Sequence, residues 1–493
     1  MAHPSSAPPV RNVVILGGGP AGLTAAWKLA ELGRPCTLLE ASGTFGGLCR
    51  TERWQGYYCD LGGHRLFTKF DEVLALWQTV LGDDLLVRPR LSRIYYHGRF
   101  FHYPLAIRNA LANLGPLEAT RCVASWARAR ARPRPTPESF DGWVSQRFGR
   151  RLFEIFFRTY TEKVWGIPTR ELSADWASQR IKDLDLGAAI RGAVRDLLPS
   201  LIRPDAAQHA SLIEEFRYPR TGPGLLFDTM AAQAESRGAR LLLRHRVVRV
   251  EHHEGRVTRV WVRQPDGGEI AFEGEDFLSS IPLTELISCL SPDPPPEVVR
   301  AARALTYRHM LVVLLVADRP GLFPDTWIYV HDPGLAVGRI QNFGNWSPAM
   351  VPDPATSSLG LEYFCSDGDR IWTMQDQDLQ DLAQRELRQT GLLGDARILG
   401  GTVFRARQAY PVYARGYERH LEVLRSYLQR LGNLQPMGRY GMFKYNNADH
   451  STLTALLAVE NLDGAAHDLW SVNADTAYHE LRGDQTRRVS GGL

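Results

Sequence analysis

The chain has 493 residues, of which 44% are hydrophobic and 23% are charged, and this composition is ordinary for a folded protein with more than one domain. The formal net charge of +4 favours no nucleic-acid partner. Six scattered cysteines without metal-ligand spacing indicate neither a disulfide framework nor a metal site, and they fit a reducing cytosol. The start lacks the pattern of a signal peptide and no apolar run could span a bilayer, so we expect a cytoplasmic protein without a transmembrane segment.

The first elements along the chain predict a nucleotide-binding unit. Residues 12–16 (N-V-V-I-L) and 35–40 (P-C-T-L-L-E) read as buried strands, and residues 23–32 have the spacing of a helix. Between them stands G-G-G-P-A-G, a G-x-G-x-x-G pattern in the strand–turn–helix context that it needs. Gly17 would make the tight turn, Gly19 would admit a pyrophosphate, and Gly22 would let the helix pack closely. Glu40 ends the second strand, where a carboxylate accepts hydrogen bonds from ribose hydroxyls.

The pattern then changes twice along the chain. Residues 105–211 show helical spacing, interrupted at 128–137 by R-A-R-A-R-P-R-P-T-P. We interpret that interruption as a solvated linker, with a phosphate or partner patch as the alternative. From residue 239 short strands and turns predict a small meander. Later elements are strands within 305–400, and helices near 378–390, over 421–431 and from about residue 449.

Two further segments indicate which dinucleotide is bound. Gly46, Gly47 and Arg50 follow the second strand closely, and residues 60–64 read D-L-G-G-H. This spacing resembles the extended FAD fingerprint of the flavin amine oxidase, protoporphyrinogen oxidase and phytoene desaturase group. The resemblance implies that Gly46, Gly47 and Arg50 close over the FAD pyrophosphate and that the D-L-G-G-H loop lies beside the isoalloxazine ring. It also implies that the glycine pair of the G-R-Y-G segment at 438–441 approaches the flavin, and that the following helix aims its N-terminus at the ring.

The predicted fold is therefore α/β, with a discontinuous, doubly wound (Rossmann-like) FAD-binding domain, a helical insert and an antiparallel-sheet substrate domain. We expect FAD-binding parts at 1–104, 216–300 (with the meander) and 413–493, a helical cap at 105–215 and a substrate region at 301–412. The candidate cofactor residues are Gly17, Gly19, Pro20, Ala21, Gly22, Glu40, Gly46, Gly47, Arg50, Gly63, His64, Gly438, Arg439, Asn447, Asp449 and His450.

Motifs spread over nearly the whole chain resemble UDP-galactopyranose mutase, in the order of that family. They are R-F-F-H-Y-P-L at 99–105, Y-T-E-K-V-W-G at 160–166, L-T-Y-R at 305–308, Y-P-V at 410–412 and G-R-Y-G-M-F-K-Y at 438–445. The resemblance implies a redox-neutral ring contraction in which reduced flavin N5 attacks the anomeric carbon while UDP leaves and returns.

The same resemblance implies roles for six residues. Arg180 and Arg308 would bind the diphosphate, and Tyr410 and Tyr445 would donate hydrogen bonds to it. Trp165 would line the sugar–uridine site, and His64 would lie at the flavin edge. Each of three assignments has a plainer alternative: Trp165 as a core aromatic residue, Arg308 as the partner of a carboxylate, and His64 as a hydrogen-bonding loop residue.

Two departures keep other substrates open. Asn446 and Asn447 stand where the mutase family has tyrosine and aspartate, and residues 216–225 (F-R-Y-P-R-T-G-P-G-L) resemble the oxidase and desaturase branch. We predict an FAD enzyme for a small molecule, a nucleotide- or lipid-linked sugar, with NAD(P)H or another electron donor as a candidate partner. The alternatives are an FAD oxidase or desaturase of an amine, tetrapyrrole or isoprenoid, and a non-catalytic flavin-binding protein. The sequence predicts no oligomeric state.

Overall fold

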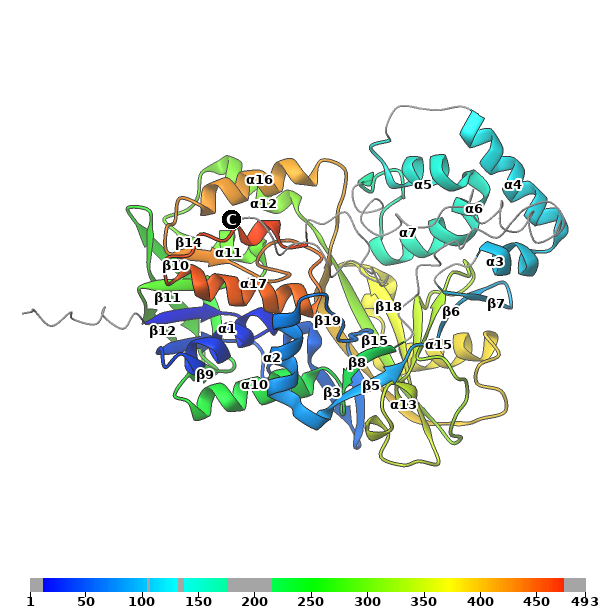
Figure 1. Cartoon of the computed structure of the whole chain (residues 1–493), viewed down its shortest axis with the longest axis horizontal. Helices are drawn as coiled ribbons and strands as arrows, with labels where there is room; N and C mark the ends of the chain where they lie inside the picture. Colours follow the sequence, from blue (N-terminus) through cyan, green and yellow to red (C-terminus); the bar gives the residue numbers. More distant parts are fainter. Residues whose placement is uncertain (1–11, 104–106, 132–136, 175–214, 474–493) are drawn as a thin grey trace, which may run out of the picture.

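The computed structural model describes residues 12–103, 107–131, 137–174 and 215–473 (Figure 1). The predicted diphosphate residue Arg180 and part of the basic interruption at 128–137 lie outside these ranges. Within them, no helix is long and apolar enough to cross a membrane.

A five-stranded parallel sheet forms the nucleotide-binding unit, and it is assembled from both ends and the middle of the chain. Its order is β20 (Leu434–Pro436), β13 (Asp276–Ser279), β1 (Val13–Leu16), β2 (Cys36–Leu39) and β9 (Arg240–Leu242). Strands β1 and β2 are entirely buried. Val13 and Ile15 share a core with the helices beside the sheet, whereas Val14 on the other face shares a core with residues of the meander. The sheet confirms the predicted discontinuous, doubly wound fold.

Helices from distant segments pack beside this sheet. Helix α1 (Pro20–Glu31) contacts both α10 (Gly224–Ser236) and α17 (Ala448–Asn461), and α10 and α17 also contact α2 (Asp71–Leu81). Figure 1 shows α1, α17 and α2 side by side. The start of the chain and its final described helix therefore form one wall of the cofactor unit.

The predicted meander is a second, four-stranded sheet next to this unit. Its order is β12 (Glu269–Glu273), β11 (Arg256–Arg263), β10 (Arg246–His253) and β14 (Leu290–Ser291). Three helices lie beside it: α11 (Leu283–Cys289), α12 (Pro296–Ala304) and α16 (Tyr417–Leu428). Helix α12 contacts both α11 and α16. The expected helix at 421–431 is thus α16, which begins four residues earlier.

A seven-stranded mixed sheet makes the predicted substrate region. Its order is β19 (Ile398–Pro411), β15 (Tyr307–Ala317), β18 (Ser357–Cys365), β17 (Arg339–Asn342), β16 (Trp327–Val330), β6 (Ser92–Tyr96) and β7 (Arg99–His102). Strands β6 and β7 come from the first expected segment, 1–104, yet they belong to this sheet: β6 pairs with β16 in parallel, and β7 pairs with β6. Sequence patterns do not reveal this pairing because parallel partners can be far apart along the chain.

The two faces of this large sheet differ in chemistry because side chains alternate along each strand. One face is apolar and packs on α15 (Asp376–Gln389), through residues such as Leu311, Val313, Leu359 and Leu361. The opposite face carries polar and aromatic side chains, among them Arg339, Glu362 and Tyr410, and this is the face that meets the cofactor unit.

A helical unit covers the β6–β7 end of the molecule. Its elements are α3 (Ile107–Leu114), α4 (Pro116–Ala131), α5 (Phe140–Phe148), α6 (Arg150–Phe153), a π-helical turn η3 (Glu154–Arg158) and α7 (Thr159–Trp165). In Figure 1 the unit forms a separate lobe above the large sheet, which α3 contacts at β7 and α7 contacts at β18. The helical insert expected from residue 105 onward is present in the described part.

The remaining short elements connect these parts. They are the hairpin β3 (Thr51–Trp54) and β4 (Tyr57–Asp60), the pair β5 (Leu85–Pro89) and β8 (Glu215–Pro219), helices α13 (Phe343–Trp346) and α14 (Arg370–Thr373), and the 3₁₀ turns η1 (Gly47–Cys49), η2 (Gly82–Asp84), η4 (Pro348–Met350) and η5 (Leu469–Ser471).

Candidate active site

The turn between β1 and α1 contains Gly17, Gly19 and Gly22, and the structural reason for a glycine differs at each of the three positions. Gly17 has a φ of +97°, which favours glycine. A Cβ on Gly22 would lie 1.8 Å from the carbonyl oxygen of Gly17, so the turn itself requires a glycine there. Gly19 is different: its φ of −80° suits any residue, and an added Cβ would approach only Gly47 Cα, at 3.9 Å. The open space beside Gly19, at the N-terminus of α1, therefore fits a phosphate.

The other residues expected around the nucleotide lie at the same turn. Glu40 accepts hydrogen bonds from the backbone N–H groups of Gly18 and Ser42, both at 2.7 Å, which holds its carboxylate beside the turn. The backbone N–H of Gly46 donates to the carbonyl of Gly18 at 2.9 Å, so the second glycine segment packs directly on the first. Arg50 is held by Glu52 at 2.6 Å and by the carbonyl of Gly47 at 3.0 Å.

The far end of the chain closes this turn. A Cβ on Gly438 would lie 2.8 Å from the Cβ of Ala21, the residue that follows Pro20 at the start of α1. Asn446 donates to the carbonyl of Gly438 at 2.9 Å. Asn447 caps α17 in a reciprocal capping box with His450, and the first turn of α17 buries Asp449 and His450. The structure thus brings together the predicted cofactor residues from both chain ends, and their individual roles stay predictions.

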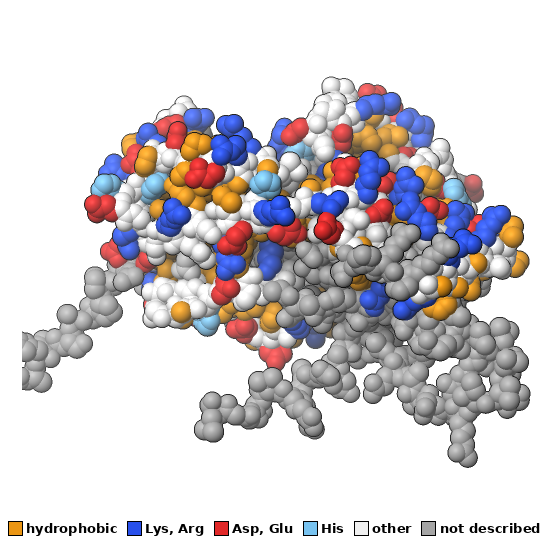
Figure 2. All heavy atoms as spheres, turned by 90° about the horizontal axis from the view of Figure 1, so that it is seen from above, with side chains coloured by type: hydrophobic (Ala, Val, Ile, Leu, Met, Phe, Trp, Pro, Cys, Tyr) orange, Lys and Arg blue, Asp and Glu red, His pale blue; other side chains and the backbone are white. Residues whose placement is uncertain are grey.

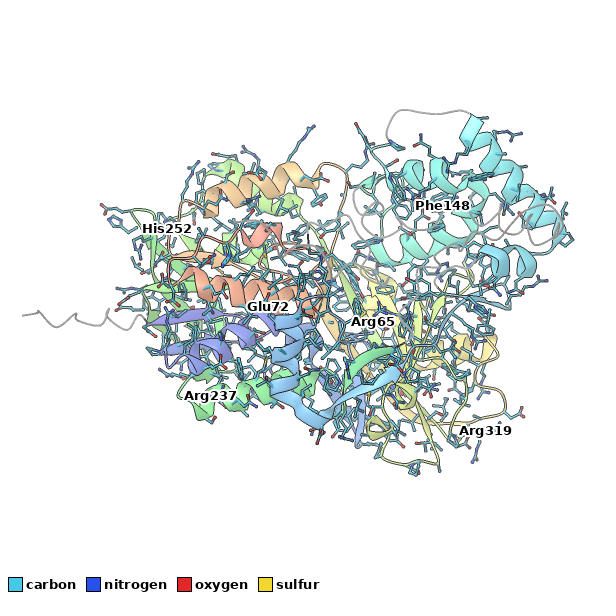
Figure 3. All side chains as sticks on the ribbon, viewed as in Figure 1. Arg65, Glu72, Phe148, Arg237, His252 and Arg319 are labelled. Carbon is cyan, nitrogen blue, oxygen red and sulfur yellow. The ribbon has the colours of Figure 1, made fainter. Side chains whose placement is uncertain are left out.

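The D-L-G-G-H loop lies where the cofactor unit meets the polar face of the large sheet. Arg65, which directly follows His64, marks this junction in Figure 3. A Cβ on Gly63 would lie 3.5 Å from Trp346 and 3.7 Å from a guanidinium nitrogen of Arg339. Burial, together with the charges of Arg339 and Arg439, lowers the pKa of His64 to about 3, so the imidazole is neutral near pH 7.

Asp60, at the start of the same loop, is a buried carboxyl group. It accepts hydrogen bonds from the hydroxyls of Tyr218 and of Thr51, the latter at 3.0 Å. Burial raises the pKa of Asp60 to about 7, although both hydrogen bonds act in the opposite direction. A Cβ on Gly222 would lie 2.7 Å from its Oδ1, so Asp60 joins the loop to the segment that leads into α10.

Arg339 is the cation at this loop that the sequence reading missed. It pairs with Glu362 on the neighbouring strand, with its Nε 2.9 Å from both carboxylate oxygens and an Nη2 contact of 2.5 Å. Arg339 Nη2 also donates to the hydroxyl of Tyr410 at 3.4 Å, and Gln341 donates to Glu362 at 2.6 Å. The side chain of Glu362 is fully buried. A charged residue within each of two otherwise buried strands was the available sequence signal.

Three predicted aromatic residues gather beside this ion pair. Trp165 lies 6.2 Å from Tyr410 and 6.1 Å from Tyr445 between ring centroids, and the two tyrosine rings stack at 5.8 Å. The guanidinium group of Arg439 lies over Tyr445 at 4.1 Å and over Tyr410 at 5.2 Å. Burial raises the pKa of Tyr410, so its hydroxyl stays protonated and can donate.

Arg308 has a different environment from the one expected. Its five N–H donors meet five protein acceptors: the carbonyls of Lys163, Val164 and Phe364, the hydroxyl of Ser366 and the carboxylate of Asp369. Gly166 packs on the guanidinium so closely that a Cβ would lie 2.4 Å from its central carbon. The plainer alternative, a carboxylate partner, is part of this arrangement. Arg308 ties the end of α7, and hence Trp165, to β18 and α14.

These residues define the class of the protein. A glycine turn at the carboxyl edge of a parallel sheet, closed by a glycine segment from the other chain end, is a dinucleotide site, and the second glycine pair and the buried loop beside it fit FAD. The protein is an FAD-dependent enzyme. The family model of the flavin-containing amine oxidoreductases matches residues 20–429, and the chain belongs to this family.

Known structures and sequences agree with that placement. A structure of reduced UDP-galactopyranose mutase superposes with a TM-score of 0.81 at 23% sequence identity. The match covers 94% of this chain and 96% of the mutase chain. A putative protoporphyrinogen oxidase from Exiguobacterium sp. 255-15 gives a TM-score of 0.69 at 18% identity, covering 92% and 98%. Both likenesses concern the fold. The L-amino acid oxidase Cdc18 of Crotalus durissus cumanensis is 51% identical over 59 residues, which is only 12% of each chain.

Proposed function

We propose that this enzyme acts on a nucleotide-linked sugar, in a ring contraction like that of UDP-galactopyranose mutase or in related sugar redox chemistry. The observation that carries the proposal is the convergence of Arg339 and Arg439 with the hydroxyl-bearing rings of Tyr410 and Tyr445 beside Gly63. Bound FAD would supply an electron-rich N5 when reduced. Every other requirement of the reaction falls on the protein.

Departure of a diphosphate from a sugar places negative charge in a site from which water is excluded. Guanidinium groups and phenolic hydroxyls stabilise such charge best where the dielectric is low. Arg339 is suited to this because Glu362 fixes its orientation and leaves Nη1 on the side of Gly63. We therefore assign the diphosphate contact to Arg339, in place of Arg308, whose donors are all engaged by the protein.

The aromatic side chains would position the uncharged part of the substrate. Trp165, Tyr410 and Tyr445 offer ring faces on which a sugar or a base can pack. Neutral His64 would offer a ring nitrogen: its Nδ1 is buried and makes no hydrogen bond to the described residues. Arg308 would act through Trp165, which it holds in place at the end of α7.

A second candidate is oxidation of an amine that carries a carboxylate, with Arg339 holding that carboxylate. Membership of the amine oxidoreductase family and the short segment shared with L-amino acid oxidases support it. The cationic, hydroxyl-rich site favours either anionic substrate over an isoprenoid.

Titration of the purified flavoprotein with UDP, followed by flavin absorbance and tryptophan fluorescence, tests the proposal. We expect a saturable change that weakens by about 100-fold in Arg339→Met/Glu362→Gln, because a charge-assisted contact contributes about 1.5–3 kcal/mol. The double substitution removes both charges and so leaves no buried ion unpaired. The matched control, Arg308→Lys, should retain the response.

Turnover separates the two candidates. Reduced enzyme should interconvert a UDP-hexopyranose and its furanose without net consumption of the electron donor. If UDP causes no change while L-amino acids reduce the flavin, the sugar proposal is wrong and the oxidase stands.

A further inference from the structure

The helical unit has a charge that the rest of the chain does not share. Residues 107–174 contain 12 Lys and Arg against 6 Asp and Glu, a net charge of +6, whereas the whole chain has +4. The remainder is therefore slightly acidic. Figure 2 shows basic side chains gathered over the end of the molecule that carries this unit. The FAD site uses none of the exposed arginines of α4.

The outer face of α4 combines arginines with small and apolar residues. Its stripe of exposed positions, about one helical turn apart, is Leu117, Arg121, Ala124 and Arg128, whereas the exposed Arg130 lies on another side of the helix. Leu117 is 67% exposed, the highest fraction among the exposed large hydrophobic residues of the described chain. An ordinary solvated helix face mixes both signs of charge, but this face has no acidic side chain.

The single acidic residue of α4 is turned toward the protein. Glu118 is half-buried and binds Arg151 on the neighbouring helix α6, and only a longer contact of 3.4 Å reaches Arg121. The described contacts give Arg128 no carboxylate partner, and Arg130 lies over the ring of Trp126 at 6.0 Å. The positive charge of the face is therefore not neutralised by its own helix.

We propose that the outer face of α4 docks on an anionic phospholipid bilayer surface. Arginines would attract the head groups, and Leu117 would enter the boundary between head groups and acyl chains. The exposed leucine and the alanines between the arginines favour a lipid surface over a nucleic acid, which is read through polar and stacking contacts. The proposal does not rest on the proposed reaction. If α4 docks in this way, the helical unit, which also contributes Trp165 to the candidate site, lies against a membrane surface.

Flotation of the FAD-loaded enzyme with vesicles tests this docking. The vesicles are phosphatidylcholine alone or phosphatidylcholine with about 30% phosphatidylglycerol, at about 0.1 M salt, where charge attraction is still felt over about 10 Å. We expect binding only to the anionic vesicles and release at about 1 M salt, where attraction is screened within about 3 Å.

Charge reversal on the face should act locally. Arg121→Glu/Arg128→Glu should weaken vesicle binding by at least about tenfold, since each basic residue at an anionic surface contributes about 1 kcal/mol. The matched control Arg319→Glu/Arg430→Glu changes the net charge equally; Arg319 lies at the opposite end of the substrate region (Figure 3). It should bind nearly as wild type. Leu117→Ser should weaken binding at unchanged charge. Retained flavin absorbance shows that each variant is folded.

Several outcomes would overturn the proposal. Equal loss in both double variants would mean that net charge alone drives binding. Equal binding to uncharged vesicles would remove the role of the arginines. Absence of vesicle binding, together with Arg121- and Arg128-dependent binding to heparin as a soluble polyanion, would assign the face to another acidic polymer.

Discussion

Arg339 on β17 and Glu362 on β18 face each other across neighbouring strands, and the guanidinium donates from two nitrogens to a carboxylate that is fully buried. Through this pair a buried carboxylate orients a cation toward the D-L-G-G-H loop, where Arg339 Nη1 would lie 3.7 Å from a Cβ on Gly63. The energetics of the pair can be measured independently of any substrate.

Single and double substitution at this pair should not be additive. Glu362→Gln alone leaves a buried guanidinium without its counter-ion and should lower the free energy of unfolding by about 3–5 kcal/mol. Arg339→Met/Glu362→Gln should cost less than the sum of the two single changes. Urea unfolding followed by intrinsic fluorescence measures all three. Simple additivity would mean that the two side chains are not coupled.

Substitutions at Gly19 and Gly22 should impair different properties, FAD binding at Gly19 and folding at Gly22. Gly19→Val should give a folded protein without FAD, because its backbone accepts a side chain and only the phosphate space is lost. Gly22→Ala should impair folding itself, because of the 1.8 Å clash with Gly17. Gly33→Ala, a control at a φ of +67° with open space around it, should cost only about 1 kcal/mol and keep FAD. Absorbance at flavin wavelengths and circular dichroism report the two properties. Full flavin occupancy in Gly19→Val would refute the cofactor placement.

Asp60 should make stability depend on pH. Its pKa is raised from 3.8 to about 7 in the folded protein, so between these values the folded state binds more protons than the unfolded state. Stability from this group is therefore complete below pH 4 and is lost as pH rises through 7, by an amount on the order of 3–4 kcal/mol. Asp60→Asn should remove this part of the slope between about pH 4 and 7. Parallel stability profiles for the two proteins would show that Asp60 titrates normally.

Arg308 should matter for structure more than for ligand binding. Lysine has three donors for the five acceptors that surround Arg308, so Arg308→Lys should destabilise the protein by about 2–3 kcal/mol. Its UDP response should remain at saturating ligand, with a shifted midpoint at most. A thermal melt and the UDP titration on the same sample measure both. Loss of the response at unchanged stability would return the diphosphate role to Arg308.

Much of the cofactor unit could be predicted from the sequence because its signals are local. The order strand, glycine turn, helix and strand follows from residues 12–40, and the structure places β1, α1 and β2 within a few residues of that prediction. The discontinuity of the sheet and the expected place of the 438–441 segment near the cofactor came from family resemblance rather than from spacing. The approach of Gly438 to Ala21 was visible only in the structure.

Only the tertiary structure decided which cation lies at the D-L-G-G-H loop. Arg308 and Arg339 look alike in the sequence, since each begins or nearly begins a strand. Pairing in the sheet placed five protein acceptors around Arg308 and a single carboxylate beside Arg339, so one became a structural clamp and the other remained directed at the loop. The sequence by itself determined the FAD-binding turn, because nearest-neighbour backbone geometry suffices there. The substrate site needed contacts between strands far apart along the chain, which no local pattern encodes.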